Sequence, residues 1–169
     1  MRTLFISLIT LYISQNSFAR PLFEDQQTKY YSHKHDILFD YATKEACEGD
    51  GMKWNGEDCL TEATDSVEIT REGQLYLVKI GTTANHTNTC EFESSNGYFN
   101  RKNKLISSQI TNDDDYEESN KAKKSTDLIC QVSITFNKDQ SISVHSKNND
   151  ENCICGLNAS LNIRKAIKN

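Results

Sequence analysis

The chain contains 169 residues, of which 36% are hydrophobic and 25% are charged, and its formal net charge is −5. This length is sufficient for one compact domain with its own core. A surface with this acidic balance repels nucleic acid and anionic membranes and tolerates or attracts basic partners. The alternative is that modest acidity serves only to keep the protein soluble.

The first 19 residues have the pattern of a removable export signal. Arg2 precedes an apolar run over residues 4–13 that is too short to span a bilayer, and Ser17 and Ala19 are the small residues expected before a cleavage site. Cleavage after Ala19 would leave 150 residues with 18 basic and 24 acidic side chains. We therefore expect a periplasmic or secreted protein, and no later segment has the length and apolar character of a membrane span.

Residues 20–60 are expected to form a small N-terminal unit that caps the rest of the chain. The start of this unit mixes aromatic and charged residues without a clean period, which indicates an extended arm. Residues 36–48 are predicted to form a short helix, which Gly49 and Gly51 would end.

Cys47 and Cys59 flank a turn-forming stretch and are predicted to form a local disulfide, which closes a loop worth about 3 kcal/mol. Trp54, the sole tryptophan, lies between them. Its indole is expected to pack over the bridge. The alternative is an exposed contact for a partner, because tryptophan is enriched at binding hot spots.

Residues 61–169 are predicted to form an antiparallel β domain, either a curved sheet or a small barrel. Residues 130–136 give the clearest strand because their apolar and polar side chains alternate strictly. A hairpin turn is expected either at Asn96-Gly97 or at residues 101–104. The other predicted segments are strands at 74–80, 89–99, 141–144 and 157–163, and a turn at 137–140.

Residues 112–124 contain no core positions and are predicted to form a polar loop. The acidic run at 113–118 is expected to be a solvated hairpin tip. The alternative, a weak cation site within residues 112–120, fits less well because the aspartates are contiguous and no glycine supplies the sharp bend of a calcium loop.

Four cysteines remain for the β domain, and in an oxidising compartment we expect them to form structural bridges. Pairing of the strand after Cys130 with the strand that follows it would place Cys130 opposite the residues just before Cys153. We therefore predict the bridges Cys130–Cys153 and Cys90–Cys155. A bridge between Cys153 and Cys155 would close a strained ring.

The sequence contains no recognised catalytic motif. His33 and His35 would share a face only on a strand, and zinc would need further ligands from elsewhere in the chain. No serine-nucleophile, zinc-protease or phosphate-loop pattern occurs. We therefore expect no catalytic site, cofactor or metal, although a carboxylate pair that is defined only in space could support a hydrolase.

A resemblance to known proteins is carried by several short segments around the cysteines. In the first loop these are Glu45-Ala46-Cys47, residues 51–56 and Cys59-Leu60, and in the β domain they are residues 83–92, 130–134 and 155–161. Together they resemble small, uncharacterised, cysteine-rich periplasmic proteins of Gram-negative bacteria, some of which are loosely described as lysozyme-inhibitor-like. The similarity covers residues 42–163. It implies an exported, disulfide-containing fold.

The leading hypothesis for function is an exported, non-enzymatic protein-binding protein, an inhibitor or immunity factor against a basic, cell-envelope-attacking enzyme such as lysozyme. Its basis is the export signal, the bridges, the acidic surface and the lack of a catalytic motif. One alternative is an envelope-stability or surface-interaction factor without an enzyme target. Another is a hydrolase with unrecognised carboxylates.

Overall fold

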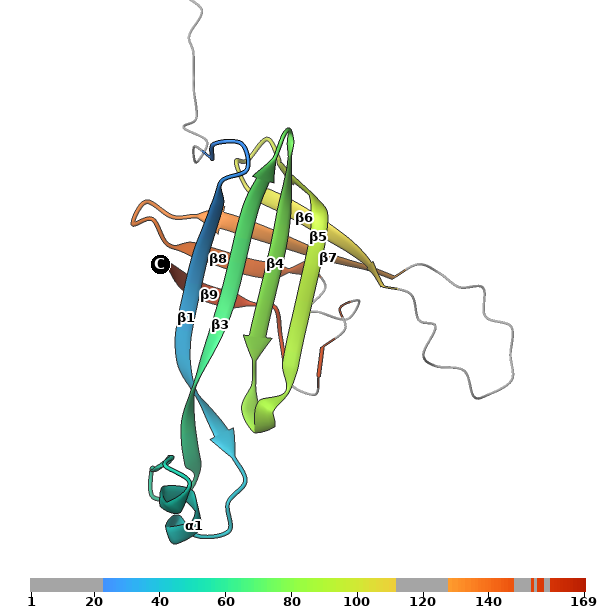
Figure 1. The fold of residues 1–169 in the computed structure, drawn as a ribbon. Coiled ribbons are helices and arrows are strands. Elements are labelled where there is room, and N and C mark those ends of the chain that lie inside the picture. The colour runs from blue at the N-terminus through green and yellow to red at the C-terminus, as the bar shows by residue number, and fades with distance from the viewer. Residues whose placement is uncertain (1–22, 112–127, 148–152, 154, 157–158) are drawn as a thin grey trace, which may run out of the picture.

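The computed structural model describes residues 23–111, 128–147, 153, 155–156 and 159–169, and most of these residues lie in β-strands. Eight antiparallel strands close into a barrel in the order β1-β9-β8-β7-β6-β5-β4-β3, and pairing of β1 with β3 completes the ring (Figure 1). The elements are β1 (Thr28–Phe39), α1 (Lys44–Gly49), β2 (Lys53–Trp54), β3 (Cys59–Glu72), β4 (Leu75–Thr83), η1 (Asn85–Thr87), β5 (Thr89–Phe99), β6 (Leu105–Thr111), β7 (Leu128–Phe136), β8 (Ile142–Ser146) and β9 (Ile163–Lys168).

Alternation of side chains along the strands fills the barrel interior. In β7, Cys130, Val132 and Ile134 are buried, while Gln131 and Ser133 are partly exposed. The same alternation in the other strands produces one continuous core. Its largest fully buried side chains are Phe92, Ile69, Leu105, Ile134, Ile142, Leu161 and Ile163.

Aromatic side chains in edge-to-face contact close the core at the end of the barrel where β1 begins. The ring centroid of Phe136 lies 6.1 Å from that of Phe23 and 6.5 Å from that of Tyr31. Tyr76 continues the group, with centroid distances of 5.5 Å to Phe23 and 5.2 Å to Phe99. Edge-to-face pairs of this kind add stability beyond the area they bury.

The antiparallel β architecture predicted from the sequence is confirmed, and of its two forms the barrel is the one observed. The predicted strands at 89–99 and 130–136 correspond to β5 and to most of β7. The hairpin turn lies at residues 100–104, where Asn100 N donates a hydrogen bond of 2.9 Å to Lys104 O. Asn96 and Gly97 instead lie inside β5.

The predicted helix, arm and last strand differ from the structure. The helix is limited to Lys44–Gly49, and residues 36–39 belong to β1, so the predicted helical cap is reduced to one short helix. β1 pairs with β3 at twelve residues, which stabilises an extended conformation over the local helix signal, and the predicted arm is therefore a barrel strand. The last strand begins at Ile163, six residues later than predicted.

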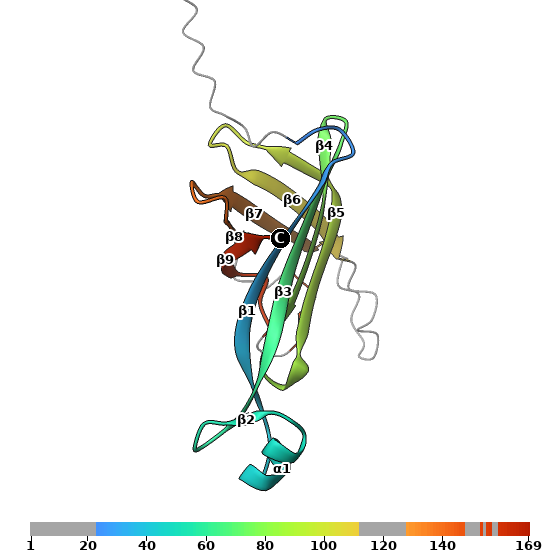
Figure 2. The same cartoon turned by 60° about the vertical axis from the view of Figure 1, so that its left-hand side comes forward.

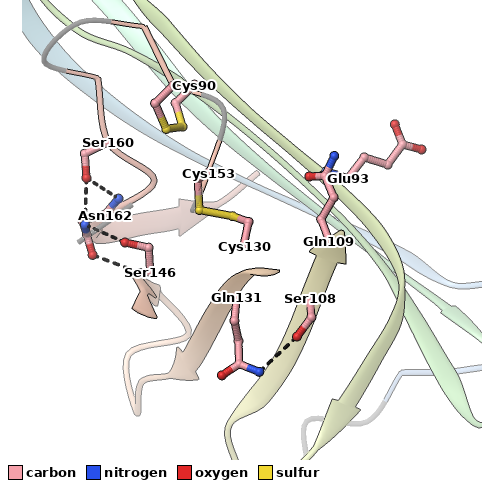
Figure 3. The surroundings of a disulfide bond; sticks show 11 residues. Cys90, Glu93, Ser108, Gln109, Cys130, Gln131, Ser146, Cys153, Ser160 and Asn162 are labelled. Carbon is pink, nitrogen blue, oxygen red and sulfur yellow. Dashed lines mark hydrogen bonds between the residues drawn. A yellow bond between two sulfur atoms is a disulfide. The ribbon is translucent and has the colours of Figure 1, made fainter. Parts of the chain in front are cut away.

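Three disulfides join the cysteines in the pairing predicted from the sequence. Two of them attach the segment that precedes β9 to the barrel wall, one at β5 and one at β7 (Figure 3). The third connects α1 to the start of β3. Bridges of this number indicate an oxidising, extracellular-type environment. The pairs are Cys47–Cys59, Cys90–Cys155 and Cys130–Cys153.

Candidate functional site

The end of β1 and the start of β3 form a two-stranded ribbon. β9 pairs with β1 only at Tyr31 and Ser32, and β4 pairs with β3 only from Ser66 onward. Residues 33–39 and 59–65 therefore pair with each other, and β2 joins them only at the far end. We refer to residues 33–65 as the ribbon and to residues 40–58 as its tip. Both Figure 1 and Figure 2 show α1 beyond the ends of the other barrel strands.

Polar contacts fix the base of the ribbon to the barrel. Asp65 Oδ1 accepts a hydrogen bond of 3.1 Å from Thr83 N and lies 3.1 Å from His35 Nε2. Further along the ribbon, near its tip, Leu38 N donates to Asn85 Oδ1 of η1 at 2.9 Å. Because Asp65 is only 6% exposed, its contacts hold β1, β3 and β4 together. The ribbon is thus held in a defined orientation.

Local hydrogen bonds and one disulfide organise the tip. The side chain of Thr43 accepts a 3.2 Å hydrogen bond from the first turn of α1 and caps this helix. Asn55 Oδ1 accepts two backbone hydrogen bonds, of 2.9 and 2.7 Å, and so fixes the turn after β2. The bridge between Cys47 and Cys59 is fully buried. A tip with these constraints loses little conformational entropy when it binds.

Trp54 lies in β2, in register with Cys59 of the bridge. It is half-buried, so part of the residue is accessible to solvent. This placement is compatible with both sequence interpretations, packing against the disulfide and contact with a partner. A role for Trp54 in binding stays a prediction.

The negative charge of the chain is concentrated in the ribbon. Residues 33–65 contain nine acidic residues and three lysines, a net charge of −6. The rest of the chain from Arg20 onward contains fifteen acidic and fifteen basic residues and is balanced. The acidic residues of the ribbon are Asp36, Asp40, Glu45, Glu48, Asp50, Glu57, Asp58, Glu62 and Asp65, and all except Asp65 are exposed.

Cations within the ribbon neutralise only part of this charge. Lys34 pairs with Glu62 and Lys44 pairs with Glu48, and all four side chains are more than half exposed. Such exposed pairs are weak and leave the carboxylates accessible to a competing cation. The ribbon therefore presents a negative surface on a rigid projection.

A hollow of about 260 Å³ lies at the base of the ribbon, lined by His35, Asp65, Thr82, Ser160 and Asn162 among others. Asp65 is the one carboxylate among the described residues that line it. Glycoside hydrolysis by the common mechanism needs two carboxyl groups. This hollow therefore gives the hydrolase alternative no direct support.

The sequence analysis predicted the three disulfides, and it singled out Trp54, whose role stays a prediction. It did not predict the ribbon or the contact between His35 and Asp65. A count of charge in a sliding window would have found the acidic concentration between residues 36 and 65. The contact at the base depends on strand register and has no sequence signal. The acidic run at 113–118 lies outside the described residues. Within the described ranges no group of three or more candidate metal ligands occurs.

No protein-family model matches the chain, and neither a curated protein nor a solved structure is significantly similar to it. In the part of the chain that the structure describes, no helix is long and apolar enough to cross a membrane. The functional argument therefore rests on the geometry and charge of this chain.

Proposed function

We propose that the protein is a periplasmic or secreted, non-enzymatic binding protein that acts as an inhibitor or immunity factor against a basic, envelope-attacking enzyme of the lysozyme type. The observation that supports this proposal best is the net charge of −6 within residues 33–65 on a projecting ribbon, next to a balanced remainder. A surface of one sign steers a partner of opposite sign and increases the rate of association.

Two further features support the proposal. The bridge between Cys47 and Cys59 and the hydrogen bonds at Asn55 preorganise the tip, which lowers the entropy lost on binding. Trp54 supplies an aromatic side chain within this acidic surface, and tryptophan is a frequent hot-spot residue.

The test is binding of the purified, oxidised protein to basic lysozymes and to acidic enzymes of similar size, followed by enzyme assays. We expect saturable binding and slowed turnover with a basic enzyme, and an association rate that falls steeply as salt is added. Absence of binding to every basic cell-wall hydrolase tested would reject the proposed function.

A matched pair of variants tests the surface. The tip variant combines Glu45→Gln, Glu57→Gln and Asp58→Asn, and the control combines Glu24→Gln, Glu72→Gln and Glu91→Gln; each removes three exposed carboxylates. The tip variant should slow association about tenfold, while the control should change it by less than about twofold. Equal effects of the two variants would show that the ribbon is not the contact surface.

A further inference from the structure

A second cavity, of about 390 Å³, opens at the end of the barrel where β1 begins. The ribbon lies at the other end of β1, so this cavity is separate from the acidic surface. Its volume is at the small end of the range for small-molecule sites, which often occupy the mouths of β-barrels. The lining includes Lys29, Tyr31, Phe136, Lys138, Ser141 and Lys168.

Among the described residues that line this cavity, the charged ones are all lysines. Lys29, Lys138 and Lys168 belong to three separate segments of the chain, and no aspartate or glutamate is among the described lining residues. Partial burial and the nearby charge of Lys168 lower the pKa of Lys29. Asp139 lies in the same turn as Lys138, but its carboxylate is 2.7 Å from Lys165 Nζ and accepts a 2.6 Å hydrogen bond from Ser141. The cavity therefore has a positive potential.

The wall of the cavity is aromatic. Phe136 is half-buried in the aromatic group of the core, and Tyr31 is 4% exposed. Burial raises the pKa of Tyr31, so its hydroxyl is a neutral donor.

We propose that this barrel mouth is a binding site for a small organic anion. A carboxylate or phosphate group is held by the ammonium groups of Lys138 and Lys168, and an apolar body packs against Phe136 and Tyr31. Lys29, whose ammonium lies 4.0 Å from the centroid of the Phe23 ring, adds positive charge at the cavity. Both parts are needed: the lysines supply charge-assisted hydrogen bonds, and the aromatic wall supplies apolar contact. This site is independent of the proposed inhibitor function.

The test is titration of the ¹⁵N-labelled, oxidised full protein with benzoate, hexanoate, phenyl phosphate, inorganic phosphate and benzyl alcohol, by calorimetry and NMR. We expect one saturable site for at least one organic anion, with the largest shifts at the amides of Lys29, Tyr31 and Phe136. Benzyl alcohol, which lacks the charge, should bind about tenfold more weakly or not at all. A preference between benzoate and phenyl phosphate would identify the head group.

Lys168→Gln and Lys138→Gln should each weaken binding roughly three- to tenfold. Both side chains are exposed, so the melting temperature should stay close to that of the parent protein. Lys53→Gln removes the same charge at the ribbon tip and should leave the affinity unchanged. The proposal fails if no organic anion binds, if benzyl alcohol binds equally well, or if Lys53→Gln has the same effect as Lys168→Gln. Equal affinity for inorganic phosphate and phenyl phosphate would also overturn it, because the apolar wall would then contribute nothing.

Discussion

Two buried serines on neighbouring strands show how differently the barrel satisfies its interior polar groups. Ser94 Oγ in β5 donates a 2.6 Å hydrogen bond to Ser108 O in β6. Ser107 in β6 is fully buried, and its hydroxyl has no partner among the described residues. The net contribution of a hydroxyl to stability depends on this difference, because an unpaired buried hydroxyl keeps its desolvation penalty.

Substitution of the two serines should therefore have opposite consequences. Ser107→Ala should leave the free energy of unfolding unchanged or increase it by up to about 1 kcal/mol, because it removes a polar atom that makes no bond. Ser94→Ala should decrease the free energy of unfolding by about 1–2 kcal/mol, because the substitution removes the hydroxyl that donates to Ser108 O. Urea unfolding of both variants measures the effect, and a destabilised Ser107→Ala would indicate a hydrogen bond that the structure does not contain.

Asp139 makes the stability of the β7–β8 turn depend on pH. Hydrogen bonds from Lys165 and then from Ser141 hold the pKa of Asp139 well below its usual range. A carboxyl whose pKa is lowered by folding stabilises the protein above its unfolded pKa, and this stability is lost as the pH falls below about 4. Asp139→Asn should therefore lower the melting temperature slightly at pH 7, and the difference from the parent should shrink at pH 2–3. Lys165→Met should remove most of the effect of Asp139→Asn.

Asn96 and Gly97 illustrate a residue pattern that the sequence leaves ambiguous. The dipeptide is typical of a hairpin turn, yet it lies inside β5. The Asn96 side chain accepts from Ser108 N at 3.0 Å and donates to Ser108 O at 2.8 Å, which replaces backbone pairing to β6. A Cβ atom at Gly97 would lie 2.8 Å from Tyr76 O, beside the register shift between β4 and β5. Both roles depend on the neighbouring strands, which are distant in sequence.

Among the elements, β1 was the hardest to predict and β7 the easiest. One face of β7 is partly exposed to solvent and the other is buried, so polar and apolar residues alternate strictly in its sequence. β1 changes its surroundings along its length, from the barrel wall at Tyr31 to the ribbon beyond Ser32, so its pattern has no single period. Its partner, β3, lies about 30 residues further along the chain, and only tertiary pairing defines the strand. The disulfide Cys47–Cys59 was predicted from its local turn, and the other two bridges from the expected pairing of the strands around Cys130.

Removal of the Cys47–Cys59 bridge should loosen the ribbon tip without opening the barrel. The chain-entropy estimate for this short loop is about 3 kcal/mol, but the bridge lies outside the continuous core. Cys47→Ser with Cys59→Ser should abolish hydrogen-exchange protection in α1 and leave protection in β7 and β8. Cys90→Ser with Cys155→Ser should instead lower the free energy of global unfolding by about 4 kcal/mol. This bridge closes a longer loop and attaches the segment before β9 to the barrel wall. Equal loss of protection in α1 and β7 for the first variant would contradict this separation.

On the scale of the whole molecule, the charge is polarised along β1. The ribbon at one end has a net charge of −6, and the cavity at the other end is lined by three lysines and no described acid. A count along the sequence can find the first of these features, because its charges are contiguous. It cannot find the second, because Lys29, Lys138 and Lys168 come together only when the barrel closes.

The two ends should behave as independent sites. Ten residues of extended strand separate Lys29 from Phe39, roughly 33 Å, which is several times the Debye length of about 8 Å at physiological ionic strength. Lys168→Gln should therefore leave the association rate of a basic partner within about twofold, and the triple tip variant should leave affinity for benzoate unchanged. In a variant that combines Lys168→Gln with the three tip substitutions, the changes in binding free energy should equal the sum of those in the separate variants within about 0.5 kcal/mol.

The coupling free energy between the two sites can also be measured by titrating each ligand in the presence and absence of the other, since any coupling must be reciprocal. A coupling of tenfold or more would mean that the barrel transmits a change between its mouth and the ribbon, through the strand that both ends share.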